Sequence, residues 1–113
     1  MKKLINDRTG EVILEDLQTA DNFYARFRGL MGRLSIPENA GLMINPCNSI
    51  HCFFMKFPID VIFLDKEDRV VHIAENMKPG RISPVVKRAK YVVEASATSL
   101  SDNVMVGDKV KIV

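Results

Sequence analysis

The chain has 113 residues, 47% of them hydrophobic and 27% charged, which is the composition of one ordinary globular domain. This balance excludes an intrinsically disordered chain, which would carry more charge and fewer apolar side chains. Sixteen basic and fourteen acidic residues give a net charge of +2, too small to predict a nucleic-acid partner. We therefore expect a single domain over residues 1–113 that does not bind nucleic acid.

The apolar runs are too short for a membrane helix, which needs about 20 residues. The run at residues 61–64 is closed on both sides by Asp60 and Asp65. Near the start, two lysines are followed by only two apolar residues, which is not the pattern of a signal peptide. The two cysteines, Cys47 and Cys52, are too few for a disulfide scaffold and are expected to be free thiols. These features favour a cytoplasmic protein.

The first third of the chain predicts a hairpin and a helix. Two segments with apolar centres, residues 3–6 and 11–15, flank a polar turn that ends in Gly10, which is typical of a β-hairpin. A helix is predicted over residues 21–33, with Thr19 or Asp21 as its cap. Its apolar face has the i, i+4, i+7, i+8 spacing and consists of Phe23, Phe27, Leu30 and Met31.

After Pro37, which ends the helical pattern, the sequence changes to strand periodicity. Short β-rich runs separated by turn residues predict strands at residues 41–45, 50–55, 59–64, 69–73, 91–95 and 109–113. The polar residues 65–68 predict a tight turn between antiparallel neighbours, whereas residues 77–84 predict a loop and residues 99–104 a short helix or turn.

These elements predict an α+β fold that is mostly β. The expected architecture is a bent or barrel-like antiparallel sheet with one main amphipathic helix. A doubly wound parallel sheet is disfavoured, because most predicted strands are too close in sequence to be joined by a crossover helix.

Several segments together resemble the family known as domain of unknown function 192. They are Arg-Gly-Leu-Met-Gly-Arg at 28–33, Gly-Leu-Met-Ile at 41–44, the long motif at 49–65, Val-Glu at 93–94 and Gly-Asp-Lys-Val at 107–110. The resemblance spans most of the chain and implies a fold rather than a chemical activity. Many members of that family carry a secretion signal or membrane anchor, and the start of this chain instead favours a cytoplasmic variant.

Two acidic residues are expected to point inward from strands. Asp60 shares a face with Ile62 and Leu64, and a buried carboxylate needs a cation or several hydrogen-bond donors. We interpret Asp60 as part of an ion pair, for example with Arg28 or Arg33, or as a cap for a nearby turn; the functional alternative is a pocket residue.

Glu94 repeats this pattern between Val92 and Ser96. Asp60 and Glu94 could therefore form a general acid and base pair, as in a glycosidase. The absence of tryptophan, which would stack on a sugar, argues against a glycosidase.

A turn at residues 46–49 could bring Cys47 next to His51, with Asp60 as an orienting carboxylate or His72 as a further metal ligand. No Cys-x-x-Cys pair completes a zinc site, so we prefer to interpret Cys52 as core packing and His51 as a rim residue. Methionines lie at core spacing in each element and are expected to fill the core rather than to bind a soft metal: Met31, Met43 and Met55.

Arginines around the predicted helix, together with Lys56, could line a surface for a carboxylate or phosphate; these are Arg26, Arg28 and Arg33. The alternative is that they are solvated or pair with Asp60 and Glu94. The basic cluster at residues 87–90 has only Tyr91 as an aromatic neighbour, and we interpret it as a solvated loop.

The favoured function is a noncatalytic binding or accessory module for a small polar or anionic ligand or a protein partner. Its candidate binding residues are Arg28, Arg33, His51, Met55, Asp60 and Glu94. No cofactor is expected. The alternative is a metal- or thiol-dependent enzyme that uses Cys47, His51 and Asp60.

Overall fold

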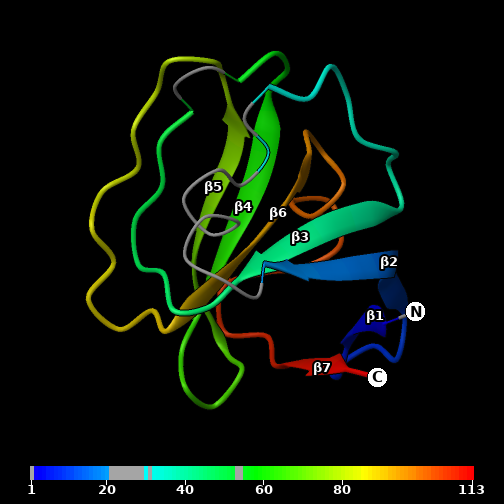
Figure 1. Cartoon of the computed structure of the whole chain (residues 1–113). Helices are drawn as coiled ribbons and strands as arrows, with labels where there is room; N and C mark the ends of the chain where they lie inside the picture. The colour runs from blue at the N-terminus through cyan, green and yellow to red at the C-terminus, as the bar shows by residue number, and fades with distance from the viewer. Residues whose placement is uncertain (1, 21–29, 31, 53–54) are drawn as a thin grey trace.

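The computed structural model describes residues 2–20, 30, 32–52 and 55–113. Within these residues, seven strands form one sheet in the order β5-β4-β6-β3-β2-β1-β7 (Figure 1). The strands are β1 (Lys2–Asn6), β2 (Val12–Ala20), β3 (Ala40–Ile44), β4 (Ile59–Leu64), β5 (Val70–Met77), β6 (Tyr91–Ser96) and β7 (Val110–Ile112). The fold is therefore mostly β, as the sequence predicts.

Both predicted hairpins are confirmed. β1 and β2 pair antiparallel, and Gly10 closes their turn with a φ of 76°, a backbone conformation that glycine adopts without strain. β4 and β5 also pair antiparallel across the polar turn. In that turn Asp65 Oδ1 accepts the backbone N–H groups of Glu67 and Arg69, so the polar residues stabilise the turn that they predict.

The sheet is mixed, and the prediction of a purely antiparallel sheet was wrong at one place. β2 and β3 run parallel, with Leu17 opposite Gly41. Parallel neighbours require the chain to cross back before the second strand begins, and residues 21–39 make that connection. The helix predicted over 21–33 falls mainly on residues 21–29 and 31, which lie outside the described residues. The part of the chain that is described contains no helix, and so none that could span a membrane.

The segment around His51 was predicted as a strand at residues 50–55, and its described part is instead an irregular ribbon. Ser83 donates its N–H to the Ile50 carbonyl and Cys52 donates to the Arg81 carbonyl, while His51 and Ile82 form a single bridge. The paired segment around Ile82 is flanked by Pro79 and Pro84, which have no N–H to donate. A regular ladder of β-sheet hydrogen bonds therefore cannot extend along it.

Apolar side chains cover both faces of the sheet. The sheet is curled, so that on its concave face strands that are not neighbours in the sheet come into contact. This face carries the inner core, which includes Leu4 of β1, Val110 of β7, Ile62 of β4 and Val93 of β6. The opposite face carries the outer core, in which loop residues Ile50, Cys52 and Met55 cover Leu42, Val61, Phe63 and Val92. Because β4 lies between the two cores, all six of its residues are buried, including Asp60.

Candidate functional site

Asp60 lies on the inner-core face of β4 and is fully buried. Its carboxylate accepts three backbone N–H groups, from Asn76 at 2.9 Å, Leu100 at 3.2 Å and Ser101 at 2.8 Å. Burial raises the pKa of this carboxyl, but the hydrogen bonds outweigh burial and hold the pKa below its usual value. Asp60 thus caps the turn that contains Leu100 and Ser101, as one interpretation of the sequence has it, and it also binds the end of β5 at Asn76. Backbone amides rather than arginines are its donors.

Glu94 lies on the opposite face, in the outer core, and is 5% exposed. Its strand neighbours are Leu42 on β3 and Val61 on β4, so apolar side chains flank the carboxyl. Oε1 has no hydrogen-bond donor among the described residues. Burial raises the pKa of Glu94 to about 7, and the positive charge of Arg33 offsets this only in part.

Asp60 and Glu94 therefore do not form the acid and base pair that their sequence pattern allowed. Asp60 is paired with Ala95 across β4 and β6, whereas Glu94 is paired with Val61. Directly paired residues share a face and successive residues alternate, so the two carboxylates point to opposite sides of the sheet.

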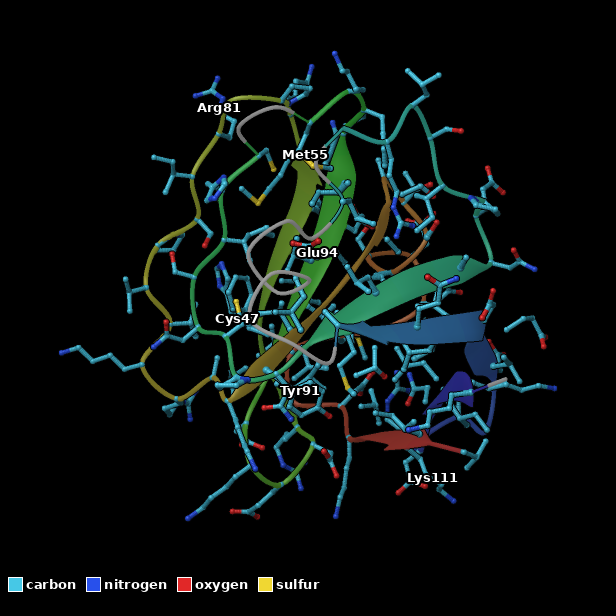
Figure 2. All side chains as sticks on the ribbon, in the orientation of Figure 1. Cys47, Met55, Arg81, Tyr91, Glu94 and Lys111 are labelled. Carbon is cyan, nitrogen blue, oxygen red and sulfur yellow. The ribbon has the colours of Figure 1, made fainter. Side chains whose placement is uncertain are left out.

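The charge of Glu94 acts on two thiols, those of Cys47 and Cys52. Figure 2 labels Glu94 and Cys47. Cys47 is half-buried, and its Sγ donates to the Ser49 carbonyl at 3.2 Å, while Cys52 is fully buried. Burial raises the pKa of both thiols, to about 11 for Cys52, and the Glu94 carboxylate raises both further. Both cysteines are therefore protonated at neutral pH, which is opposite to the activation that a nucleophilic cysteine needs.

The other predicted site residues are not gathered into one site. Asp60 lies on the other side of the sheet from Cys47, which packs against the outer core. His51 is half-buried on the ribbon. In the described ranges no group of three or more His, Cys, Asp and Glu side chains is placed to hold a metal ion. The arrangement that the enzyme or metal alternative requires is therefore not found in these residues.

The remaining candidates are placed differently. Arg33 is exposed, and its positive charge lowers the pKa of Glu94. This agrees with the alternative in which the arginines interact with the buried carboxylates. Met55 is buried in the outer core, where methionine was expected to pack. Arg28 lies outside the described residues.

A cleft of about 830 Å³ opens beside Cys47. Three segments that are distant in sequence form it, and backbone hydrogen bonds hold them together: Cys47 N–H donates to the Lys90 carbonyl and Lys90 N–H donates to the Leu64 carbonyl. The lining residues are Pro46, Cys47, Asn48, Asp65, Lys66, Glu67, Arg88, Ala89 and Lys90. Because Cys47 and Ala89 also pack against the outer core, the cleft borders the region that contains Glu94.

The walls of the cleft are more basic than acidic. Lys66, Arg88 and Lys90 are exposed cations, and the only acidic wall residues are Asp65 and Glu67. The Asp65 carboxylate already accepts two backbone N–H groups of its own turn. The sequence showed Arg88 and Lys90 as part of a basic cluster, but nothing in the sequence indicated that this cluster faces the turn at Lys66.

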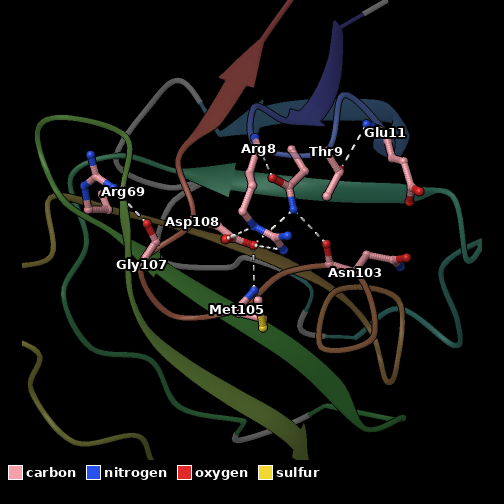
Figure 3. Close-up of polar contacts among 9 residues, drawn as sticks. Arg8, Thr9, Glu11, Arg69, Asn103, Met105, Gly107 and Asp108 are labelled. Carbon is pink, nitrogen blue, oxygen red and sulfur yellow. Dashed lines mark hydrogen bonds and ion pairs between the residues drawn. The ribbon is translucent and has the colours of Figure 1, made fainter.

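Asp108 is a further buried carboxylate, and its partners are drawn in Figure 3. It accepts hydrogen bonds from Arg8 Nε at 2.7 Å, from Asn6 Nδ2 at 3.1 Å and from the Met105 N–H at 2.9 Å. The Arg8 side chain lowers the pKa of Asp108 to about 2. This network joins the first hairpin to the last turn, so we assign it a structural role.

The sequence profile of the DUF192 family, described as an uncharacterized ACR, matches residues 4–112. The chain belongs to the DUF192 family. A UPF0127 protein of Pyrococcus abyssi is 42% identical over 101 residues, which cover 84% of each chain. A UPF0127 protein of Thermococcus sibiricus is 36% identical over 113 residues, which cover 95% of this chain and 72% of the relative. The family resemblance inferred from the motifs is thus confirmed.

Two solved structures have a similar fold. A protein of unknown function from Novosphingobium aromaticivorans superposes with a TM-score of 0.82 at 22% identity, over 97% of this chain and 82% of the other. A protein from Sinorhizobium meliloti gives a TM-score of 0.81 at 22% identity, over 97% and 90% of the two chains. At this identity the likeness establishes the fold alone.

Proposed function

We propose that this DUF192 chain is a noncatalytic binding domain that holds a small anionic ligand in the cleft beside Cys47. The observation that carries this proposal is the combination of a cleft of about 830 Å³ with three cationic side chains on its walls. Cavities of roughly 300 to 1,000 Å³ are the usual size for small-molecule sites.

The chemistry of the walls favours an anion with an apolar part. Lys66, Arg88 and Lys90 can direct ammonium or guanidinium donors at a carboxylate, sulfonate or phosphate. Pro46 and Ala89, with the Cys47 thiol, provide apolar contact surface. A ligand held in this way needs no reactive group from the protein, and the raised pKa of Cys47 supports binding rather than nucleophilic chemistry.

Benzenesulfonate is a suitable probe, because its charge is permanent and its ring is apolar. Titration into isotope-labelled protein should shift the amide resonances of Asn48, Lys66, Ala89 and Lys90, measured by two-dimensional NMR. The double variant K66Q/R88Q should bind about fivefold more weakly, since two wall cations are removed.

The matched control is K2Q/K78Q, which removes two exposed cations outside the cleft and should leave the affinity unchanged. The proposal fails if benzenesulfonate does not bind. It also fails if the shifted amides are spread over the surface, or if both double variants lose the same affinity.

A further inference from the structure

Cys47 lines the cleft and packs against the outer core, which is on the same face of the sheet as the buried carboxyl of Glu94. Glu94 Oε1 accepts no hydrogen bond from the described residues. The Cys47 side chain lies within the electrostatic influence of Glu94. Figure 2 shows Glu94 near the middle of the sheet, with Cys47 on the neighbouring loop. The structure therefore places an ionisable group behind the cleft and not on its surface.

We propose that Glu94 modulates the affinity of the cleft for anions: the cleft binds an anion more tightly while the Glu94 carboxyl is protonated and more weakly when it is ionised. This inference rests on the proposed function of the cleft. Glu94 would act through the protein interior, as a specificity-determining residue that does not touch the ligand.

The environment of Glu94 favours this coupling. Leu42 and Val61 flank the carboxyl, so little water is present to screen its charge. Buried charges are screened much less by salt than exposed charges are. An ionised Glu94 adds one negative charge that acts on Cys47, and the walls of the cleft that Cys47 lines carry three cations and two carboxylates.

The sign of the coupling follows from linkage. An anion in the cleft disfavours ionisation of Glu94, so binding of the anion takes up a proton, and by reciprocity protonation of Glu94 strengthens binding of the anion. Burial brings the pKa of Glu94 to about 7, so the effect falls in the neutral range. The affinity for an anion should therefore rise as the pH falls.

Other charged and titratable groups near the cleft and the outer core must be separated from Glu94. Cys47 and Cys52 stay protonated because their pKa values are raised. The other charged or ionisable side chains around this region are Arg33, His51, His72 and the wall residues of the cleft. The substitution E94Q removes the carboxyl and leaves both imidazoles in place, so it isolates the contribution of Glu94.

The test is the affinity for benzenesulfonate between about pH 5.5 and pH 8.5, for the unmodified chain, E94Q and the control E75Q, which alters an exposed glutamate of β5. In the unmodified chain the affinity should fall about threefold to tenfold as the pH rises across this range. E75Q should show the same fall, and E94Q should bind with nearly constant affinity. Neutral benzenesulfonamide should bind independently of pH in all three proteins.

The outcomes separate the two proposals. If benzenesulfonate binds in the cleft and E94Q keeps the same pH dependence, or the unmodified chain shows none, the role of Glu94 is wrong and the binding function stands. If benzenesulfonate does not bind at any pH, both proposals fail. A second readout is the carboxyl resonance of Glu94, whose titration midpoint should rise when benzenesulfonate is added and stay fixed with benzenesulfonamide.

Discussion

The two faces of the sheet each bury a carboxylate, and they treat it in opposite ways. On the inner face, three backbone N–H groups surround Asp60 and keep it ionised. On the outer face, Glu94 Oε1 has no donor among the described residues, and burial brings its pKa to about 7. Burial alone therefore does not decide the state of a carboxyl in this fold; the supply of donors does.

The largest effect is expected from removing the satisfied carboxylate. D60A should lower the free energy of unfolding by about 3 to 5 kcal/mol at pH 7, because the amides of Asn76, Leu100 and Ser101 would lose their acceptor. The pKa of Asp60 is lowered in the folded state, so its contribution is present at neutral pH and is lost as the pH falls through the folded-state pKa.

Urea denaturation measures this difference. E75A, which removes an exposed carboxylate from β5, is the control and should change the free energy of unfolding by less than about 0.5 kcal/mol. A loss below about 1 kcal/mol in D60A would show that water replaces the carboxylate as acceptor for these amides.

Removing the Glu94 carboxyl is expected to have the opposite effect and to raise the free energy of unfolding at and above neutral pH. Its folded-state pKa, about 7, lies above the ordinary value of 4.5, so the folded protein binds the proton more tightly than the unfolded chain does. The stability of the protein should therefore decrease as the pH rises from about 4.5 to 7, by about 3 kcal/mol in total.

The variant E94Q removes this ionisation. The free energy of unfolding of E94Q should equal that of the unmodified chain near pH 4 and should be about 3 kcal/mol higher at pH 8.5. Urea denaturation at each pH measures both values. E75Q should follow the unmodified chain at both values. If E94Q were the less stable protein at pH 8.5, the ionised carboxylate would have a stabilising partner in the folded state.

The smallest effect concerns the Cys47 thiol, which lines the cleft and responds to the charge of Glu94. With a disulfide reagent at pH 8.5, half-buried Cys47 should react in the native protein, and fully buried Cys52 should react only on unfolding. E94Q should accelerate Cys47 about twofold, since the carboxylate raises the pKa of this thiol. An unchanged rate in E94Q, compared with E75Q, would show that the charge of Glu94 does not reach the wall of the cleft.

Local patterns in the sequence predicted much of the sheet. The hairpin around Gly10 and the turn at residues 65–68 follow from turn chemistry and strand alternation, and both are confirmed. Strand alternation also placed Asp60 on one face with Ile62 and Leu64, as the register of β4 and β6 bears out. The motif at residues 49–65 correctly indicated the family, but part of it forms an irregular ribbon where a strand was predicted.

Long-range pairing explains what local patterns missed. The parallel pairing of β2 with β3 depends on the connection over residues 21–39, and no periodicity within either strand reveals its direction. The cleft joins residues 46–48, 65–67 and 88–90, which are distant in the sequence, so the basic cluster at 87–90 looked like an ordinary solvated loop.

The sequence by itself determined the family of this chain, its β-rich fold and its two hairpins. It also determined that two acidic side chains point inward from their strands. Only the tertiary structure decided that Asp60 and Glu94 face opposite sides, because the face depends on how β4 and β6 pair. It also decided which carboxyl finds donors. The amides that satisfy Asp60 come from Asn76, Leu100 and Ser101, which lie far along the chain and meet Asp60 only after folding.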